Sequence, residues 1–172
     1  MPMSRTTVDV AAYAERARSG PCCICECVAG NPAYAHRIVY RDEWLVAFMD
    51  RYPTMPGKIL VAPIRHLEHV VADLSLPEFL ALMGLVYRVA AAVEATVATE
   101  RLYLLSLGSP QGNRHLHWHI APLPPGVPYE QPQFQALMME NGVVDGGPQD
   151  LKAIANYVEA LLSRADPRDV AD

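Results

Sequence analysis

Short apolar runs separated by polar, proline- or glycine-containing turns predict a sheet in the middle of the chain. These runs are rich in the β-branched and aromatic residues typical of strands. The predicted strands cover residues 38–40, 44–49, 58–63, 102–107 and 114–122. The first two form a hairpin around residues 41–43, and a turn at 53–57 precedes the third. A glycine-bearing loop at 108–113 joins the last two.

Apolar residues at helical spacing predict three helices around this sheet. Residues 6–18 form a short amphipathic helix, and residues 151–163 form a closing one. The clearest helix begins at Ser75, where Ser75 and Glu78 make a capping box, and it runs to about residue 98. The fold class is therefore α+β, an antiparallel sheet of about five strands with the 75–98 helix packed on one face.

Three of the six histidines alternate with apolar residues inside the last predicted strand. His115, His117 and His119 would share one face, because successive side chains of a strand point to opposite faces. A single histidine there is usually a satisfied polar residue at a sheet edge. Three in a row contribute little to packing, so a functional site is the better explanation.

Composition limits what such a site serves. The 172 residues, 51% hydrophobic and 19% charged, suit one domain over residues 1–172, with a helical extension at about 148–164. A net charge of −5 without a basic run disfavours a nucleic-acid-binding surface. The N-terminal segment carries charges and does not read as a secretory signal, and no apolar stretch approaches a membrane span. We therefore expect a cytoplasmic protein with no membrane partner.

All four cysteines lie between residues 22 and 27, too close together for two ordinary disulfides. Cys22 and Cys25 form a C-x-x-C pair, whose spacing suits two thiolates on one zinc ion. The pair supplies only half of a tetrahedral site. A redox pair or an incidental cluster remains the alternative.

Residues 115–121 match the pattern His-φ-His-φ-His-φ-φ, in which φ is apolar, and the chain thereby resembles the histidine triad family of nucleotide hydrolases and transferases. The resemblance covers about residues 22–124. The other matching features are C-x-x-C at 22–25, Ala-Gly at 29–30, Val-Tyr-x-Asp-Glu at 39–43, Ala-Phe-x-Asp at 47–50, Pro-Gly at 56–57, Pro-x-x-His at 63–66, and Gln111.

This resemblance implies a complete zinc site. In zinc-containing members the ion is held by residues that correspond to Cys22, Cys25, His66 and His115. Such a Cys₂His₂ site is structural, because it leaves no open position for substrate. His69 competes with His66 for this role, and Cys23 or Cys27 could replace one of the thiolates.

The resemblance also implies the catalytic roles. His117 would attack the α-phosphorus of an adenosine-type nucleotide, and the nucleotidyl-histidine formed would then be hydrolysed. His119 would act on the phosphate or the leaving group as a cationic donor or general acid. Gln111 would donate to phosphate, with Gly112 and Asn113 beside it in the nucleotide-binding loop. Asp50 would bind the ribose hydroxyls, unless it only caps the turn at 51–53.

Two departures from the family leave the substrate open. Lys58 stands where many members have histidine, and could supply charge near the phosphates or point to solvent. Gly112 stands where a phosphate-contacting Ser or Thr is common.

The expected function is a hydrolase or nucleotidyl transferase acting on a dinucleoside polyphosphate or nucleoside phosphoramidate. The alternative is a non-catalytic nucleotide- or zinc-binding protein. Family members commonly dimerise through the long helix and a sheet edge, so we expect a homodimer.

Overall fold

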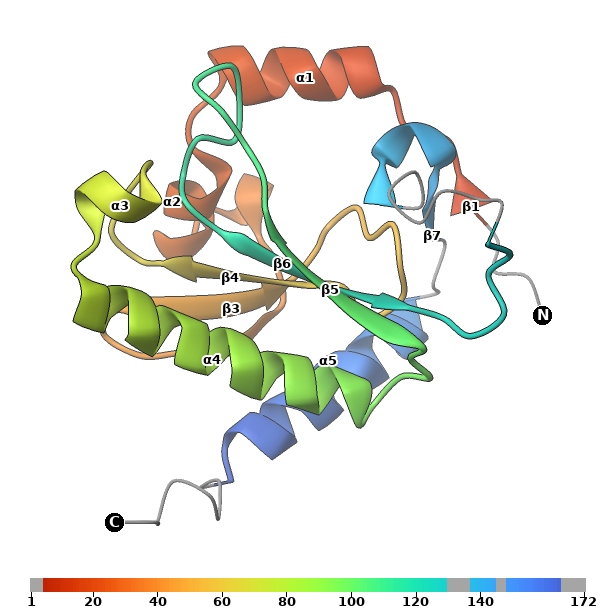
Figure 1. Cartoon of the computed structure of the whole chain (residues 1–172). Coiled ribbons are helices and arrows are strands. Elements are labelled where there is room, and N and C mark those ends of the chain that lie inside the picture. The colour runs from red at the N-terminus through yellow and green to blue at the C-terminus, as the bar shows by residue number, and fades with distance from the viewer. Residues whose placement is uncertain (1–4, 130–136, 145–147, 165–172) are drawn as a thin grey trace.

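A five-stranded antiparallel sheet forms the centre of the molecule (Figure 1). The computed structural model describes residues 5–129, 137–144 and 148–164. The strand order is β2-β3-β4-β6-β5, with the bounds Ile38–Arg41, Leu45–Met49, Ile59–Pro63, Trp118–Leu123 and Arg101–Ser106. Helices pack against this sheet, so the α+β class and the number of strands are confirmed.

Helices α4 (Leu76–Glu94) and α5 (Pro148–Leu162) cover one face of the sheet. On that face Ala47 pairs with Val61, and Val61 pairs with Trp118, so the three side chains lie in a row across three strands. They belong to the main core cluster, which also contains Val86 of α4 and Val158 of α5. Successive side chains of a strand point to opposite faces, so the alternate residues of β3 and β4 lie on the other face, where Val46, Phe48 and Ala62 pack with Ile24 in a second, smaller core cluster.

The opposite face of the same strands carries the polar residues that sequence analysis singled out. Leu60 pairs with His119 on one side and with Phe48 on the other. Asp50 directly follows β3 and Lys58 directly precedes β4, and the Asp50 N–H donates to the Lys58 carbonyl at 3.0 Å. Sheet register therefore brings these two charged residues to one end of the face that holds His119.

Helix α4 begins where the capping box predicts and ends earlier than expected. The Ser75 N–H donates to the Glu78 carboxylate at 2.8 Å, and the Glu78 N–H donates to the Ser75 hydroxyl at 3.4 Å. The helix ends at Glu94 and not at about residue 98. Two β-branched residues follow, and the Thr96 hydroxyl donates to the Ala92 carbonyl at 2.6 Å, which satisfies one of the last carbonyls of the helix.

By length and composition alone, α4 could cross a membrane, since it has 19 residues and a mean hydropathy of 1.6. A single such helix is weak evidence for a membrane span, because the buried core helix of a globular domain passes the same test. Seven of its residues are nevertheless buried, among them Leu82, Val86 and Val89, and these pack on the sheet. The helix is thus a core helix of this domain.

Shorter elements surround the sheet. They are β1 (Arg5–Thr6), α1 (Val10–Ser19), α2 (Cys23–Val28), η1 (Pro32–Tyr34), α3 (Val70–Asp73), η3 (Met139–Asn141) and β7 (Val143–Val144). Helix α1 starts later than the predicted residue 6, because Arg5–Thr6 pairs with β7 and the Asp9 carboxylate accepts from the Ala12 N–H at 2.9 Å. Figure 1 shows α1 beside the loop that joins β5 to β6.

Candidate active site and metal centre

The histidine segment is only partly a strand. Strand β6 begins at Trp118, so His115 and His117 precede the paired region, and the prediction of a strand from residue 114 is wrong there. The Leu116 N–H donates at 2.6 Å to the carbonyl of Leu67, which lies in a loop and not in a neighbouring strand. The alternation of side chains is kept, since the intervening apolar residues are all buried in the main core: Leu116, Trp118 and Ile120.

The three histidines divide into two groups. The rings of His117 and His119 lie edge to face, with centroids 4.7 Å apart and an angle of 64° between their planes. The His115 ring instead lies 4.7 Å from the ring of His66. The predicted row of three imidazoles is thus a pair facing one site and a single ring facing another.

His117 is buried and held in one tautomer. Its Nδ1 lies 2.6 Å from the His115 carbonyl oxygen, which can only accept, so Nδ1 carries the proton and donates. Burial lowers the pKa of His117 and outweighs the opposing effect of that hydrogen bond. The neutral ring therefore has its lone pair on Nε2, the atom that a nucleophilic role requires.

His119 lies against that lone pair. Its Nε2 is 3.0 Å from Nε2 of His117, and since the latter accepts, His119 donates from Nε2. Its Nδ1 is buried without a hydrogen-bond partner among the described residues. Burial, the nearby Lys58 charge and His117 lower the pKa of His119 to about 3. In the free protein His119 is therefore neutral near pH 7.

Asp50 and Lys58 form a buried ion pair beside these histidines. The Lys58 ammonium lies 2.9 Å from Oδ2 of Asp50, and Oδ1 of Asp50 accepts from the Tyr52 N–H at 2.9 Å. Burial alone would raise the pKa of Asp50, but the Lys58 charge and the Tyr52 N–H hold that pKa below its usual value. Lys58 does not point to solvent, and Asp50 does make the turn contact that the sequence left open.

A cavity of about 500 Å³ opens over this face of the sheet. His117, His119, Asp50, Lys58 and Asn113 are among the described residues that line it. Its volume lies within the range of about 300–1,000 Å³ usual for small-molecule sites. Four of the residues that we expected to bind nucleotide are thus gathered around one space: Asp50, Asn113, His117 and His119.

Gln111 and Gly112 are not among the described residues that line this cavity. They belong to a tight turn closed by Ser109 and Gly112, whose backbone groups exchange two hydrogen bonds of 3.0 Å. Gln111 is exposed at its tip. In this arrangement Asn113 lines the cavity and Gln111 does not.

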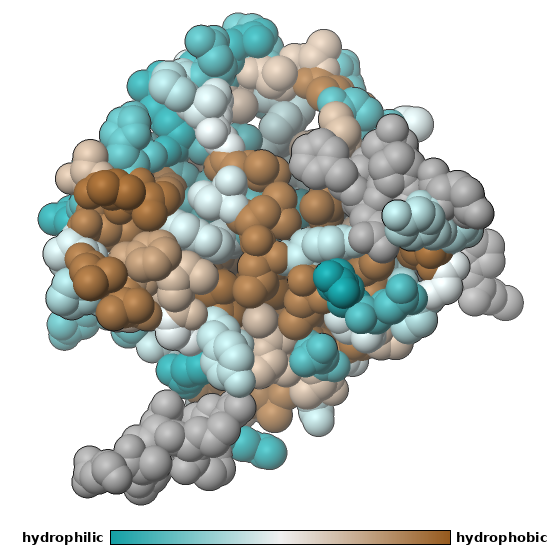
Figure 2. Space-filling view, in the orientation of Figure 1, coloured by the Kyte–Doolittle hydropathy of each residue, from teal (hydrophilic) through white to brown (hydrophobic). Residues whose placement is uncertain are grey.

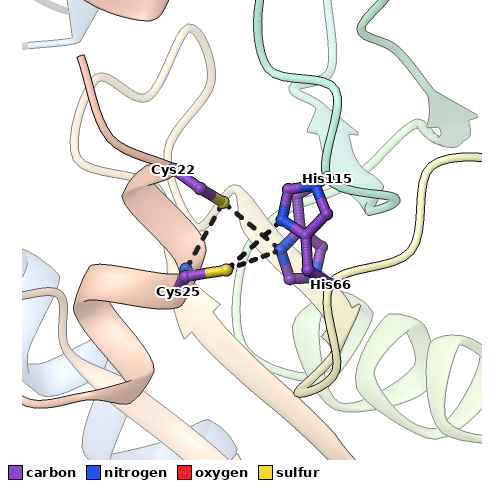
Figure 3. Close-up of side chains that lie close together, drawn as sticks. All are labelled: Cys22, Cys25, His66 and His115. Atoms are coloured by element: carbon purple, nitrogen blue, oxygen red, sulfur yellow. Dashed lines mark hydrogen bonds between the residues drawn. The ribbon is translucent and has the colours of Figure 1, made fainter.

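Four potential metal ligands converge on the other side of His115 (Figure 3). Cys22 and Cys25 come from the start of α2, His66 from the loop after β4, and His115 from the segment before β6. Sγ of Cys22 lies 3.3 Å from Nδ1 of His115, and Sγ of Cys25 lies 3.3 Å from Nδ1 of His66. All four ligand atoms lie within 4.8 Å of one another.

These distances and donor types fit a tetrahedral zinc ion. Bond lengths of about 2.3 Å to sulfur and about 2.0–2.1 Å to nitrogen separate the sulfur and nitrogen corners of a tetrahedron by about 3.6 Å. Burial and the neighbouring Cys22 thiol raise the pKa of Cys25 to about 12, because none of the described residues offsets a second negative charge there. A divalent cation would supply that offset.

The surroundings of the two histidines also fit a metal centre. Nε2 of His115 lies 2.9 Å from the Pro63 carbonyl, and Nε2 of His66 lies 3.1 Å from the Glu68 carboxylate. Both contacts place the ring proton on Nε2 and leave the Nδ1 lone pair directed at the cysteines. Burial lowers the pKa of His115 to about 4, which keeps this lone pair available.

The structure also decides between the rival ligands. His66, and not His69, belongs to the group of four, and neither Cys23 nor Cys27 does. Cys23 and Cys27 both lie in α2. The sequence pattern did not predict this helix. A six-residue helix is too short to show a clear helical period, but the Cys22 sulfur accepts from the Cys25 N–H at 3.5 Å and caps its first turn.

Sequence analysis missed several residues that line the cavity. Tyr13 and Arg16 come from α1, and Tyr34 and His36 come from the segment before β2. The amphipathic pattern of residues 6–18 indicated a helix but not what it would cover. No local signal placed His36 here, because its ring contacts Phe48 of β3, with centroids 5.0 Å apart, only once the chain has folded.

Comparison with known proteins agrees with this geometry. A family model described as HIT domain matches residues 32–125. An uncharacterized HIT-like protein of Saccharolobus solfataricus is 31% identical over 105 residues, which cover 59% of this chain and 73% of that protein.

Solved structures show the same fold. A hypothetical histidine triad nucleotide-binding protein from Sulfolobus tokodaii matches with a TM-score of 0.65 at 22% identity, covering 82% of this chain and 91% of that one. A zinc-bound histidine triad family protein from Mycobacterium smegmatis matches with a TM-score of 0.62 at 22% identity, covering 83% of this chain and 93% of that one. At this identity the structural likeness describes the fold.

Proposed function

The chain belongs to the HIT domain family, and on that premise we propose that it is a nucleotide-binding hydrolase or nucleotidyl transferase. It cleaves the α-phosphate linkage of an adenosine-type nucleotide through a nucleotidyl-histidine intermediate. The observation that carries this proposal is the hydrogen bond of 2.6 Å between His117 Nδ1 and the His115 carbonyl, which leaves the Nε2 lone pair on the cavity side beside His119.

The reaction has two displacements at one phosphorus atom. His117 Nε2 forms a bond to the α-phosphorus while the bond to the leaving group breaks, and the leaving group takes a proton from His119 Nε2. Water then attacks the same phosphorus and gives its proton to His119, and the phosphorus–nitrogen electrons return to His117. His119 is neutral in the free protein, and a bound phosphate raises its pKa by adding negative charge nearby. With substrate bound it takes up a second proton on Nδ1, so it gives the Nε2 proton to the leaving group as a cation and returns to the neutral form that later accepts the proton of water.

Other cavity residues have supporting roles in this proposal. Lys58 is a fixed buried cation that offsets the charge of the reacting phosphate. Asp50 can still accept from ribose hydroxyls, since Oδ2 pairs with Lys58 and Oδ1 accepts from the Tyr52 N–H, which leaves each oxygen a second lone pair. Asn113 contacts the phosphates. Gln111 and Gly112 do so only if the loop at 108–113 shifts toward the cavity.

Zinc is the metal we propose for Cys22, Cys25, His66 and His115. The support is the Cys₂His₂ donor set, the Nε2 contacts that direct both imidazoles, and the zinc-bound family member from Mycobacterium smegmatis. With four protein ligands, zinc would supply structural stability and no open position for substrate. It would anchor the segment that carries the His115 carbonyl, and hence the tautomer of His117.

A trapped intermediate tests the catalytic proposal. The wild-type protein is mixed with adenosine 5′-phosphoramidate and with diadenosine tetraphosphate, quenched rapidly, and analysed by intact-mass and peptide mass spectrometry. We expect one adenylyl group on His117 and a loss of turnover of at least about 100-fold in His117→Ala. His36→Ala serves as the matched control, because His36 lines the same cavity but makes no bond to phosphorus.

Two outcomes contradict the proposal. Turnover that survives in His117→Ala would remove His117 as the nucleophile. Binding of AMP by the wild-type protein without turnover of either substrate would assign the protein to non-catalytic nucleotide binding on the same fold.

A homodimer also belongs to this proposal. Exposed apolar side chains lie along α3, α4 and the end of β5, and Figure 2 shows hydrophobic surface over this region. They are Val71, Leu76, Leu80, Tyr87, Leu104 and Leu107. Strand β5 is an edge of the sheet. Exposed apolar patches beside a strand edge are typical of association surfaces.

A further inference from the structure

Helix α1 forms one wall of the cavity, although it lies outside the matched residues 32–125. The Asn113 side-chain amide donates to the Tyr13 hydroxyl at 2.9 Å, which ties the loop at 108–113 to the helix. A Cβ placed on Gly112 would lie 3.3 Å from Cβ of Ala17, so loop and helix are in close contact. The helix therefore contributes side chains to the site from a part of the chain that the family model does not describe.

The charge around this cavity is the reverse of the charge of the whole chain. The protein has a formal net charge of −5. Five basic residues but only Asp50 and Glu68 as acidic ones are among the described residues that line the cavity. The basic residues are Arg16, Arg18, Arg51, Lys58 and Arg114. A concentration of one sign of charge in a cleft favours a ligand of the opposite sign.

Three of these cations already have partners. Arg18 pairs with Glu15 at 2.8 Å, Lys58 pairs with Asp50 at 2.9 Å, and Arg51 donates to the Ala33 carbonyl at 3.0 Å. The guanidinium groups of Arg16 and Arg114 have no hydrogen bond or ion pair within the part of the chain that the structure describes. Both are exposed, and both line the cavity.

We propose that Arg16 and Arg114 form an anion subsite that binds the phosphate groups of the leaving group. This inference rests on the proposed function, in which His117 and Lys58 act on the reacting phosphate at the buried floor of the cavity. Arg16 of α1 and Arg114, directly before His115, lie at the exposed part of its lining. Guanidinium groups bind phosphate through paired, charge-assisted hydrogen bonds. The pair therefore selects substrates whose leaving group is itself a polyphosphate.

Two substrates separate this subsite from the reaction centre. Attack at the α-phosphorus of diadenosine tetraphosphate releases a polyphosphorylated nucleotide, whereas adenosine 5′-phosphoramidate releases ammonia. We expect Arg16→Gln and Arg114→Gln each to raise KM for the tetraphosphate about tenfold or more and to leave KM for the phosphoramidate unchanged. Arg101→Gln is the matched control, because Arg101 is an exposed arginine of β5 that does not line the cavity.

Binding of inorganic tripolyphosphate, measured by calorimetry, tests the subsite without turnover. We expect weaker binding in Arg16→Gln and Arg114→Gln than in the wild type and in Arg101→Gln. Equal KM changes for both substrates, or tripolyphosphate affinities that match the wild type, would overturn the subsite. If the wild type turns over neither substrate but shows this pattern of tripolyphosphate binding, the proposed reaction fails and the subsite stands.

Discussion

The buried pair of Asp50 and Lys58 is the feature of this site that individual residues explain best. A lysine ammonium with only 6% of the residue exposed is costly unless a carboxylate compensates it, and Asp50 does so at 2.9 Å. The pair is held by the register of β3 and β4 and by the turn contact of Asp50. A permanent positive charge is thereby fixed beside two neutral histidines.

Breaking this pair from one side should destabilise the protein. We expect Lys58→Met to lower the free energy of unfolding by about 3–5 kcal/mol, because Asp50 is then left as an uncompensated buried charge. Adding Asp50→Asn to Lys58→Met should recover part of this loss. Urea unfolding of the wild type, both single variants and the double variant measures the coupling, and strictly additive losses would contradict it.

The pair should also give stability a defined pH dependence. The folded pKa of Asp50 is lowered, so its contribution is present above its usual pKa of about 3.9 and is lost as pH falls through the folded pKa. We expect the difference in unfolding free energy between wild type and Asp50→Asn to be smaller at pH 3 than at pH 7. A difference that is the same in urea titrations at both values would count against the assigned shift.

Residue parity explains which parts of the site the sequence could predict. His117 and His119 share a face because the period of two is a local property of extended backbone, and the C-x-x-C spacing is equally local. The partner of Lys58 depends on the register between β3 and β4, and the choice of His66 over His69 depends on where the loop after β4 turns. Neither is encoded in a short window of sequence.

Helix α1 and the loop at 108–113 act together as one wall of the cavity. Their contact requires a small residue at 112, because a Cβ there would approach the Ala17 side chain to 3.3 Å. Asn113 takes a positive φ of 53°, and its side-chain amide donates a hydrogen bond to Tyr13 that joins this loop to the helix. The glycine that departs from the usual family residue is thus explained by the helix that packs on it.

Replacing Gly112 by serine, a residue common in the family at this position, should weaken the packing of α1 on the loop. We expect Gly112→Ser to increase hydrogen exchange and tryptic cleavage within α1, since the added side chain pushes against Ala17. Adding Ala17→Gly should partly reverse the effect by removing the opposing methyl group. Gly84→Ser is the matched control, because nothing lies within 4 Å of a Cβ at Gly84. Unchanged exchange in α1 of Gly112→Ser would contradict the close contact.

A helix was predictable from the sequence when its apolar pattern continued over several turns, and a strand when an apolar run stood between clear turn signals. Helix α4 and all five strands follow from apolar periodicity, and the start of α4 follows from Ser75 and Glu78. The six residues of α2 are too few for such a pattern, and β6 starts at Trp118 because Leu116 bonds to a loop. The contact between α1 and the β5–β6 loop is long-range, so the helix was predictable and its role was not.

The proposed zinc site joins three distant parts of the molecule, namely α2, the loop after β4 and the segment before β6. Metal removal should therefore destabilise the whole domain. We expect about one equivalent of zinc in wild-type protein purified without added metal, and a lower Tm by several degrees after chelation or in His66→Ala. His69→Ala is the matched control, since His69 lies three residues away and outside the ligand group. Less than half an equivalent would contradict the assignment.

The exposed face of α4 is the surface through which we propose that two molecules associate. The helix is apolar enough to resemble a membrane span, yet only 39% of the residues in its 18-residue apolar stretch are buried within one chain. Its outer positions include Leu80 and Tyr87, which are 59% and 58% exposed. A single chain leaves this surface in water, whereas a second copy packed helix to helix, with β5 at the adjoining sheet edge, would cover it.

We expect the wild type to have about twice the 18.9 kDa mass of one chain in light scattering at micromolar concentration, and Leu80→Glu to be a monomer. A buried carboxylate without a partner would oppose association, while in the monomer the same side chain is solvated. Tyr157→Glu is the matched control, because Tyr157 is a similarly exposed apolar residue, at 53%, that belongs to α5 and not to α4. A wild-type monomer, or a dimer that tolerates Leu80→Glu, would show that the apolar face of α4 has a different role.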